Sequence, residues 1–267
     1  MVPSYKELIE RTDAPSGSSW GLFGPEDEIG TLNFIGQEQR LAAAACVRRG
    51  ATFNLDLPLD AFPIPPSGHR GVPRHRIFAN SPHHRDDVID NFYLQGSSQV
   101  DGLRHFAHPR YGFYNNIASE KVSAGSPTIG VNRYAEHCIF GRGVLLDLDR
   151  YLRSKGRNPL DHAAGEAYSV ELLDEVAKND GVEIRQGDIV VMRTGWLDYY
   201  QNTLDDAGRT ALSQQLRSPG LVQSHTTLEW LWDNRIAGIA SDNVGIEAVP
   251  TVADSPFASE EHSAPGA

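Results

Sequence analysis

"GDIVVMRTGW", residues 187–196, is the stretch that indicates the fold class most strongly. Its centre is a run of four apolar residues, 189–192, which is followed by polar Arg193 and Thr194. Successive side chains of a strand point to opposite faces, so a run that is apolar at every position predicts a strand buried on both sides. Arg193, Thr194 and Trp196 end this strand, where a site could form, although packing at a strand end explains them equally well.

Segments of both structural types surround this strand. Further strands are expected over residues 51–60, 88–95, 141–149 and 235–243. Helices are expected over residues 36–50, 168–181 and 226–234. In the second helix, Ser169 suits the N-cap and Gly181 the stop. The two types mix without one repeating period, which argues against a solenoid and a coiled coil and favours an α/β fold. The first 19 residues are expected to form an irregular arm.

Composition narrows the function classes. Of the 267 residues, 40% are hydrophobic and 22% charged, so the chain can bury a sizeable core. The net charge of −11 argues against a nucleic-acid surface. Two cysteines, Cys46 and Cys138, without a CxxC pair suit a reducing cytosol. The N-terminus lacks a secretory signal pattern, and no apolar run approaches the roughly 18 residues of a membrane span. We therefore expect a cytoplasmic protein that contacts neither membrane nor nucleic acid.

One stretch departs from this acidic background. Residues 69–85 contain four arginines and four histidines and no acidic residue. Two interpretations remain open: a solvated loop beside the aspartates of residues 86–90, or a loop that faces an anion or forms the rim of a site.

"QGSSQVDGLRHFAHP", residues 95–109, concentrates groups that can carry chemistry. If the backbone is extended from Gln99, the side chains of Gln99 and Asp101 point to one face, and a turn at Gly102 can return His105 to that face. Aspartate and histidine beside an open position suit a divalent cation that activates water. Glutamine offers only a neutral oxygen, which is a weaker ligand. A hydrogen-bonded Asp/His pair without a metal is the alternative.

The same segment resembles the motif His-x-Gly-Thr-His-x-Asp-x-x-x-His of the cyclase family of metal-dependent hydrolases, which includes bacterial kynurenine formamidase and isatin hydrolase. The Asp of the motif falls on Asp101 and its last His on His105, whereas its first two His positions fall on Gln95 and Gln99. "WGLFGPEDEIGTLNFI" (20–35), "GRGVLLDLD" (141–149) and "IASDNVGIEAVP" (239–250) also resemble segments of a longer, largely uncharacterised branch. In that branch the replacement of His by Gln is a familiar form. The resemblance covers roughly residues 20–250.

This resemblance implies the swivelling β/β/α architecture, in which a mixed sheet core is flanked by helices. It implies one cyclase-like domain over residues 1–267 and assembly as a homo-oligomer. Family members continue with a His and a Glu that bind metal. The chain is therefore expected to lack its C-terminal segment, and His262 is not matched to either ligand.

The resemblance also implies a reaction. One divalent ion, Zn or Mn, would be held by Asp101 with Gln99 or Gln95, and His105 would shuttle protons. A small amide, lactam or ester would be hydrolysed, as in arylformamidases, with Phe106 and Tyr114 binding the substrate. The alternative is a degenerate, non-catalytic family member that binds a small molecule or a partner.

Overall fold

The computed structural model describes residues 2–258 of the chain. Its central element is a three-stranded parallel sheet in the order β3-β5-β7. The strands span Gly143–Asp147 (β3), Ile189–Arg193 (β5) and Gly238–Ser241 (β7). Strand β5 lies in the middle, with Val190 and Met192 almost fully buried on one face and the other face half-buried. The strand predicted from residues 187–196 is therefore confirmed, together with the two strands expected on its flanks.

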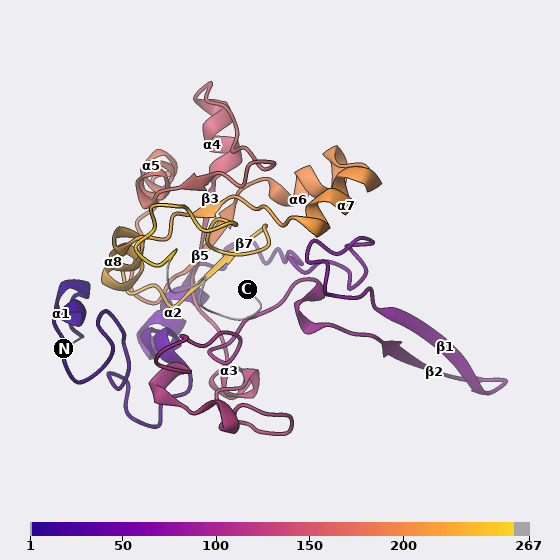
Figure 1. The fold of residues 1–267 in the computed structure, drawn as a ribbon, viewed down its shortest axis with the longest axis horizontal. Coiled ribbons are helices and arrows are strands. Elements are labelled where there is room, and N and C mark those ends of the chain that lie inside the picture. The colour runs from indigo at the N-terminus through magenta and orange to yellow at the C-terminus, as the bar shows by residue number, and fades with distance from the viewer. Residues whose placement is uncertain (1, 259–267) are drawn as a thin grey trace.

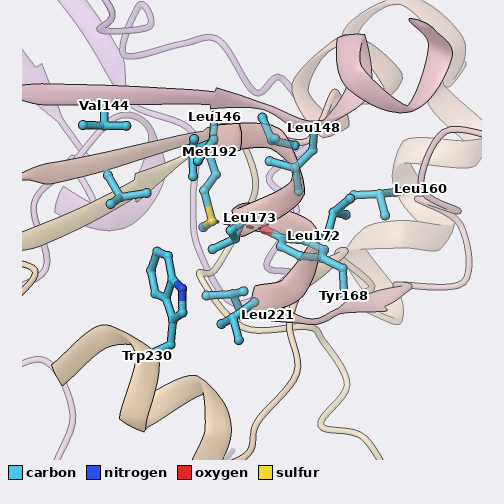
Figure 2. Packing of buried hydrophobic residues seen from close by; sticks show 14 of the residues in the cluster. Val144, Leu146, Leu148, Leu160, Tyr168, Leu172, Leu173, Met192, Leu221 and Trp230 are labelled. Carbon is cyan, nitrogen blue, oxygen red and sulfur yellow. Dashed lines mark hydrogen bonds between the residues drawn. The ribbon is translucent and has the colours of Figure 1, made fainter. Parts of the chain in front are cut away.

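Helices α5 (Val170–Asp180) and α8 (His225–Asp233) bury their apolar sides against this sheet. Val170, Leu173 and Ala177 recur at the three- and four-residue spacing of one helix face. Helix α5 ends at Gly181, whose φ of 65° is the left-handed conformation that closes a helix. Figure 2 shows Leu173, Met192, Leu221 and Trp230 converging between the sheet and these helices. Both helices confirm their predicted ranges to within two residues.

The remaining α-helices lie around this core (Figure 1). They are α1 (Tyr5–Ile9), α2 (Gln37–Ala45), α3 (Val131–His137), α4 (Leu148–Ser154), α6 (Trp196–Asp198) and α7 (Asp206–Gln214). A π-helical turn, Tyr199–Thr203, follows α6, and short 3₁₀ turns lie at Gly30–Phe34, Leu94–Gly96, Tyr114–Asn116 and Ser119–Lys121. Within residues 2–258, no helix is both long enough and apolar enough to cross a membrane.

Two further small sheets complete the secondary structure. Strands β4 (Ala167–Tyr168) and β6 (Gly220–Leu221) form a short parallel pair. Strands β1 (Arg74–Ser81) and β2 (His84–Asp90) form an antiparallel hairpin that extends away from the body in Figure 1. A sheet core flanked by helices is present as expected, but the expected mixture of parallel and antiparallel strands within that sheet is not found in the described residues. In the described part of the chain, the core sheet is wholly parallel and the antiparallel ladder belongs to the hairpin.

Two expected strands differ from the structure. Residues 51–60 form no strand, and Phe53 and Leu55 are 81% and 76% exposed. The alternation of apolar and polar residues is present. Among the described residues, however, no neighbouring strand forms backbone hydrogen bonds with this segment. The strand expected over 88–95 ends at Asp90, because Asn91 has a φ of 55° and a 3₁₀ turn begins at Leu94. Residues 74–85, for which the sequence indicated a loop, are mostly strand and turn instead.

The N-terminal arm, residues 1–19, is not irregular throughout. Helix α1 begins at a capping box formed by Ser4 and Glu7. Its Tyr5 and Leu8 are buried in a cluster with Trp232 of α8. Near the other end of the described chain, Ser255 donates a 2.9 Å hydrogen bond to the Gln223 carbonyl. His262 lies outside the described residues.

Candidate active site

The segment 95–109 contains the turn that its sequence predicts. The His105 amide donates a 2.9 Å hydrogen bond to the Gly102 carbonyl, which closes a turn over residues 102–105. The Leu103 amide donates to the Tyr134 hydroxyl at 3.2 Å and so ties this turn to α3. The turn returns His105 to the side on which Asp101 lies.

Four polar side chains meet there. Asp101 Oδ1 and His105 Nδ1 are 3.7 Å apart, and both side chains are 41% exposed. Gln99 Nε2 donates to Asp101 Oδ2 at 3.2 Å, and Gln95 Nε2 lies 3.5 Å from His105 Nδ1. A separation of 3.7 Å is too long for a direct hydrogen bond. One water molecule in contact with both groups can connect Asp101 and His105.

A cavity of about 380 Å³ opens beside this group. Asp101, His105, Phe106 and Tyr114 line it, whereas Gln95 and Gln99 do not. The cavity has further lining residues to which the sequence analysis assigned no role: Trp20, Leu103 and His108. Trp20 comes from a segment about eighty residues away in sequence, and no local spacing could have linked it to this cavity.

Tyr114 is a buried and fixed part of the cavity wall. Its hydroxyl donates a 2.8 Å hydrogen bond to Asp27 Oδ2, and the same carboxylate accepts from the Gly30 amide and from Asn33 Nδ2. Burial, and then the hydrogen bond to the Asp27 carboxylate, raises the pKa of Tyr114 above its ordinary value. The hydroxyl therefore stays protonated at neutral pH. Phe106, in contrast, is 64% exposed.

The imidazole ring of His108 is fixed by backbone amides that follow it in the sequence. Its Nδ1 accepts hydrogen bonds from the amides of Arg110 at 3.1 Å and Tyr111 at 3.3 Å. These two donors favour the tautomer with the proton on Nε2, and the ring also packs on Tyr111 with centroids 4.6 Å apart. His108 thus contributes a fixed imidazole to the cavity wall.

One residue of the basic stretch 69–85 lies beside this group. Arg70 Nη1 donates a 2.6 Å hydrogen bond to the Gln95 carbonyl. Partial burial lowers the pKa of Arg70, and the negative charge of Asp101 opposes that shift. The position of Arg70 favours one of the two interpretations of residues 69–85. At Arg70, this stretch forms the rim of the candidate site and is not a solvated loop.

A divalent ion would need several donor atoms at set separations from one another. Around a tetrahedral ion with bonds of about 2.1 Å, two ligand atoms lie roughly 3.4 Å apart. A half-turn of the Gln99 amide places its oxygen where Nε2 now lies, 3.2 Å from Asp101 Oδ2. Asp101 and Gln99 are therefore spaced as two ligands of one ion would be. Residues 2–258 contain no group of three or more His, Cys, Asp or Glu side chains that could hold a metal, so an ion at Asp101 would depend on glutamine oxygens for its other protein ligands.

Three further polar side chains, Arg193, Asp242 and His225, make contacts that hold the framework of the fold. Arg193 Nη1 contacts Asp147 and Asp149 at 3.0 and 3.3 Å, at the carboxyl end of the parallel sheet. Asp242 accepts hydrogen bonds from the Thr194 amide and hydroxyl, both at 2.7 Å, and so holds the end of β5. His225 Nδ1 lies 2.9 Å from the Tyr5 hydroxyl and not in the wall of the cavity.

Comparison with known proteins adds the family. A family model described as "Putative cyclase" matches residues 55–248. The chain belongs to the cyclase family. A crystal structure described as that of a novel cyclase is similar to this chain, with a TM-score of 0.75 and 29% identity over 86% of this chain and 79% of that one.

A second similar structure is an isatin hydrolase bound to the product analogue thioisatinate. Its TM-score is 0.46 and its identity 17%, over 80% of this chain and 76% of that one. A search of curated proteins gives no match. The assignment to the cyclase family therefore rests on the match to the family model. The assignment of the fold rests on the similarity to the crystal structure of the novel cyclase.

Proposed function

We propose that this protein is a metal-dependent hydrolase of a small amide, lactam or ester, in which His105 moves protons beside the Asp101 carboxylate. The observation that carries the proposal is the pairing of these two side chains, 3.7 Å apart, in the wall of one cavity of about 380 Å³. Hydrolysis requires a group that takes a proton from the attacking water and a space that holds the substrate. The carboxylate, the imidazole and the cavity supply these.

In this mechanism Asp101, with Gln99 and Gln95, would hold the ion. When bound, the ion would supply a positive charge that acidifies water and polarises a carbonyl group. The His105 imidazole can accept a proton from water. It then returns this proton to the leaving nitrogen or oxygen, and the Asp101 charge stabilises the imidazolium between the two steps.

The remaining wall suits a flat, mostly apolar substrate. Trp20, Phe106 and Tyr114 bring three aromatic rings to one small cavity. Aromatic faces bind ring systems by burial and by offset stacking. An arylformamide or a cyclic amide therefore matches the cavity better than a peptide or a sugar does.

A second candidate function is non-catalytic binding of a small molecule. The hydrogen bond from Gln99 to Asp101 favours it, because that carboxylate already has a neutral partner without an ion. The two functions make different predictions for metal content and turnover.

The test is to measure bound zinc and manganese by elemental analysis, together with hydrolysis of a formanilide, a lactam and an aryl ester. We expect about one metal ion per chain and turnover of at least one substrate. Asp101→Asn should lower metal affinity by about tenfold or more and abolish turnover, because an amide lacks the carboxylate charge. His105→Gln should abolish turnover while the ion remains bound.

Asp60→Asn is the control, because Asp60 is an exposed carboxylate that does not line the cavity. It should leave both measurements unchanged. Turnover by the Asp101→Asn variant at the parent rate would refute the proposed role of Asp101. Ligand binding without turnover of any substrate would favour the second function.

A further inference from the structure

A second cavity, of about 540 Å³, lies outside the candidate active site. Residues 158–163, Glu166 and Tyr199 line it, and none of them lines the cavity beside Asp101. Its volume is within the range of small-molecule sites. A ligand of the second cavity would therefore be separate from the substrate proposed above, and the two can be tested independently.

Hydrogen bonds hold the wall of the second cavity in place. The Asp161 amide donates to Glu166 Oε2 at 2.6 Å, the Glu166 amide donates to the Asp161 carbonyl at 3.1 Å, and the Ala164 amide donates to Asp161 Oδ1 at 2.9 Å. Leu160, which is 5% exposed, packs into the core cluster at one end of this turn (Figure 2). At the other end, the Gly220 amide donates to the Glu166 carbonyl at 3.3 Å. A wall that is ordered before a ligand arrives loses little conformational entropy on binding.

The wall of the second cavity is negatively charged. Asp161 and Glu166 are exposed, and the second oxygen of each carboxylate accepts no hydrogen bond from the described residues. Burial lowers the pKa of His162, so its imidazole is neutral at pH 7 and does not offset this charge. Among the described residues no Lys or Arg lines the cavity, and Arg217, which donates to the Ala164 carbonyl at 3.3 Å, lies outside its wall. Two carboxylates and a neutral imidazole give a net charge of −2, which attracts cations.

The spacing of these groups does not suit a metal ion. Asp161, His162 and Glu166 are all of types that bind metals, and all three line the second cavity. Residues 2–258 nevertheless contain no group of three or more such side chains that could hold an ion. The three groups are therefore spread around the wall, and a cation that contacts them must be built from several atoms.

The rest of the wall suits the apolar part of such a cation. The Tyr199 amide donates to the Gly195 carbonyl at 3.1 Å, and the Tyr199 ring packs on His162 with centroids 5.2 Å apart. Pro159 and Leu160 add aliphatic surface. The face of an aromatic ring attracts a cation, and the ring also buries apolar groups. The second cavity thus combines negative charge with an apolar surface.

We propose that the second cavity binds a small organic cation. Its ammonium or amidinium group contacts the carboxylates of Asp161 and Glu166, and its apolar body packs against Tyr199. Such a group has several N–H donors, so it can donate charge-assisted hydrogen bonds to both carboxylates at once. The same wall repels an anion, and a neutral molecule of the same shape gains nothing from its charge.

The first test titrates the full chain by calorimetry with three cations: phenethylammonium, butylammonium and benzamidinium. The comparison ligands are 2-phenylethanol, which has the phenethyl body without the charge, and the anion 3-phenylpropanoate. At least one cation should bind with a dissociation constant of about 0.1–1 mM, and both comparison ligands should bind at least about tenfold more weakly. The proposal is overturned if no cation binds at about 10 mM, or if the alcohol binds as tightly as phenethylammonium. Displacement of the bound cation by equimolar zinc would assign the cavity to a metal ion and also overturn it.

The second test locates the bound cation. Ala163→Trp fills the cavity without a change of charge and should weaken binding of the cation by about tenfold or more. Ala164→Trp is the matched control, because it adds the same bulk at an exposed neighbour that does not line the cavity. It should bind as the wild type does. Wild-type affinity in Ala163→Trp would place the cation elsewhere and overturn the proposal.

The third test removes the charge. Asp161→Asn combined with Glu166→Gln keeps the oxygen acceptors of the turn and should weaken binding by about five- to tenfold, since exposed ion pairs are individually weak. Asp60→Asn combined with Glu120→Gln makes the same change of net charge at exposed residues outside the cavity and should leave the affinity unchanged. Thermal melting by circular dichroism shows whether each variant is folded, and Glu166→Gln alone replaces a double variant that is not. Unchanged affinity in the folded cavity variant, or an equal loss in the control, overturns the proposal.

Discussion

At the scale of single residues, the candidate site depends on polar side chains whose partners come from distant segments. Tyr114 reaches Asp27 across 87 residues of sequence, and Arg70 reaches the carbonyl of Gln95. Within the site, the contacts among Gln99, Asp101 and His105 are local. A substitution at Tyr114 therefore tests whether the wall of the cavity is fixed by long-range contacts.

Tyr114→Phe should lower the free energy of unfolding by about 1–2 kcal/mol, because the Asp27 carboxylate loses a buried donor while the ring is kept. Urea unfolding followed by circular dichroism measures this change. Tyr93→Phe, at a side chain that is 40% exposed, is the control and should change stability by less than about 0.5 kcal/mol. If the two variants unfold at the same urea concentration, the hydrogen bond to Asp27 does not stabilise the site.

At the scale of elements, close backbone packing fixes the short strands. Strand β6 lies against the chain at residues 246–248, where the Leu221 amide donates to the Ile246 carbonyl at 2.9 Å. A Cβ atom at Gly220 would approach the backbone of Glu247 to 2.2 Å. Only glycine permits this approach without displacement of the backbone.

Gly220→Ala should therefore destabilise the protein by about 2–4 kcal/mol, since neither backbone can yield without loss of its hydrogen bonds. Gly143→Ala is the matched control at the start of β3, because a Cβ atom there meets nothing within 4 Å. It should be neutral or slightly stabilising. Differential scanning calorimetry compares the two, and a Gly220→Ala variant that melts with the wild type would contradict the close packing.

At the scale of the whole molecule, stability should depend on pH through His162. This half-buried histidine packs on Tyr199, with ring centroids 5.2 Å apart, in the wall of a second cavity of about 540 Å³. Burial lowers the pKa of His162 below 6.5, although Asp242, Asp149 and Asp161 oppose the shift. The native state then binds fewer protons than the unfolded state as the pH falls below about 6.5, so acid favours unfolding.

His162→Gln should remove this contribution. Between pH 7.5 and 5.5, the free energy of unfolding of the variant should fall less than that of the wild type, as measured by urea titrations at each pH. His69→Gln, at an exposed histidine, controls for the loss of an imidazole from the surface. An unchanged pH dependence in His162→Gln would show that burial does not shift this group.

By itself, the sequence determined the features that depend on local pattern. The continuous apolar run at 189–192 predicted β5, Ser169 and Gly181 predicted the two ends of α5, and Gly102 predicted the turn that returns His105 to Asp101. The match to the family motif at Asp101 and His105 likewise needed no structure. These features are local because side-chain direction and turn preference follow from neighbouring residues.

Only the tertiary structure decided which segments meet. Residues 51–60 alternate as a strand should, yet they form none, whereas the polar stretch 74–90 forms an antiparallel hairpin. Trp20 reached the cavity, and Gln95 and Gln99 did not line it. The physical reason is that periodicity states which face of a segment is apolar. It does not state which distant segment supplies the hydrogen bonds or covers that face, because those partners are set by the packing of the whole chain.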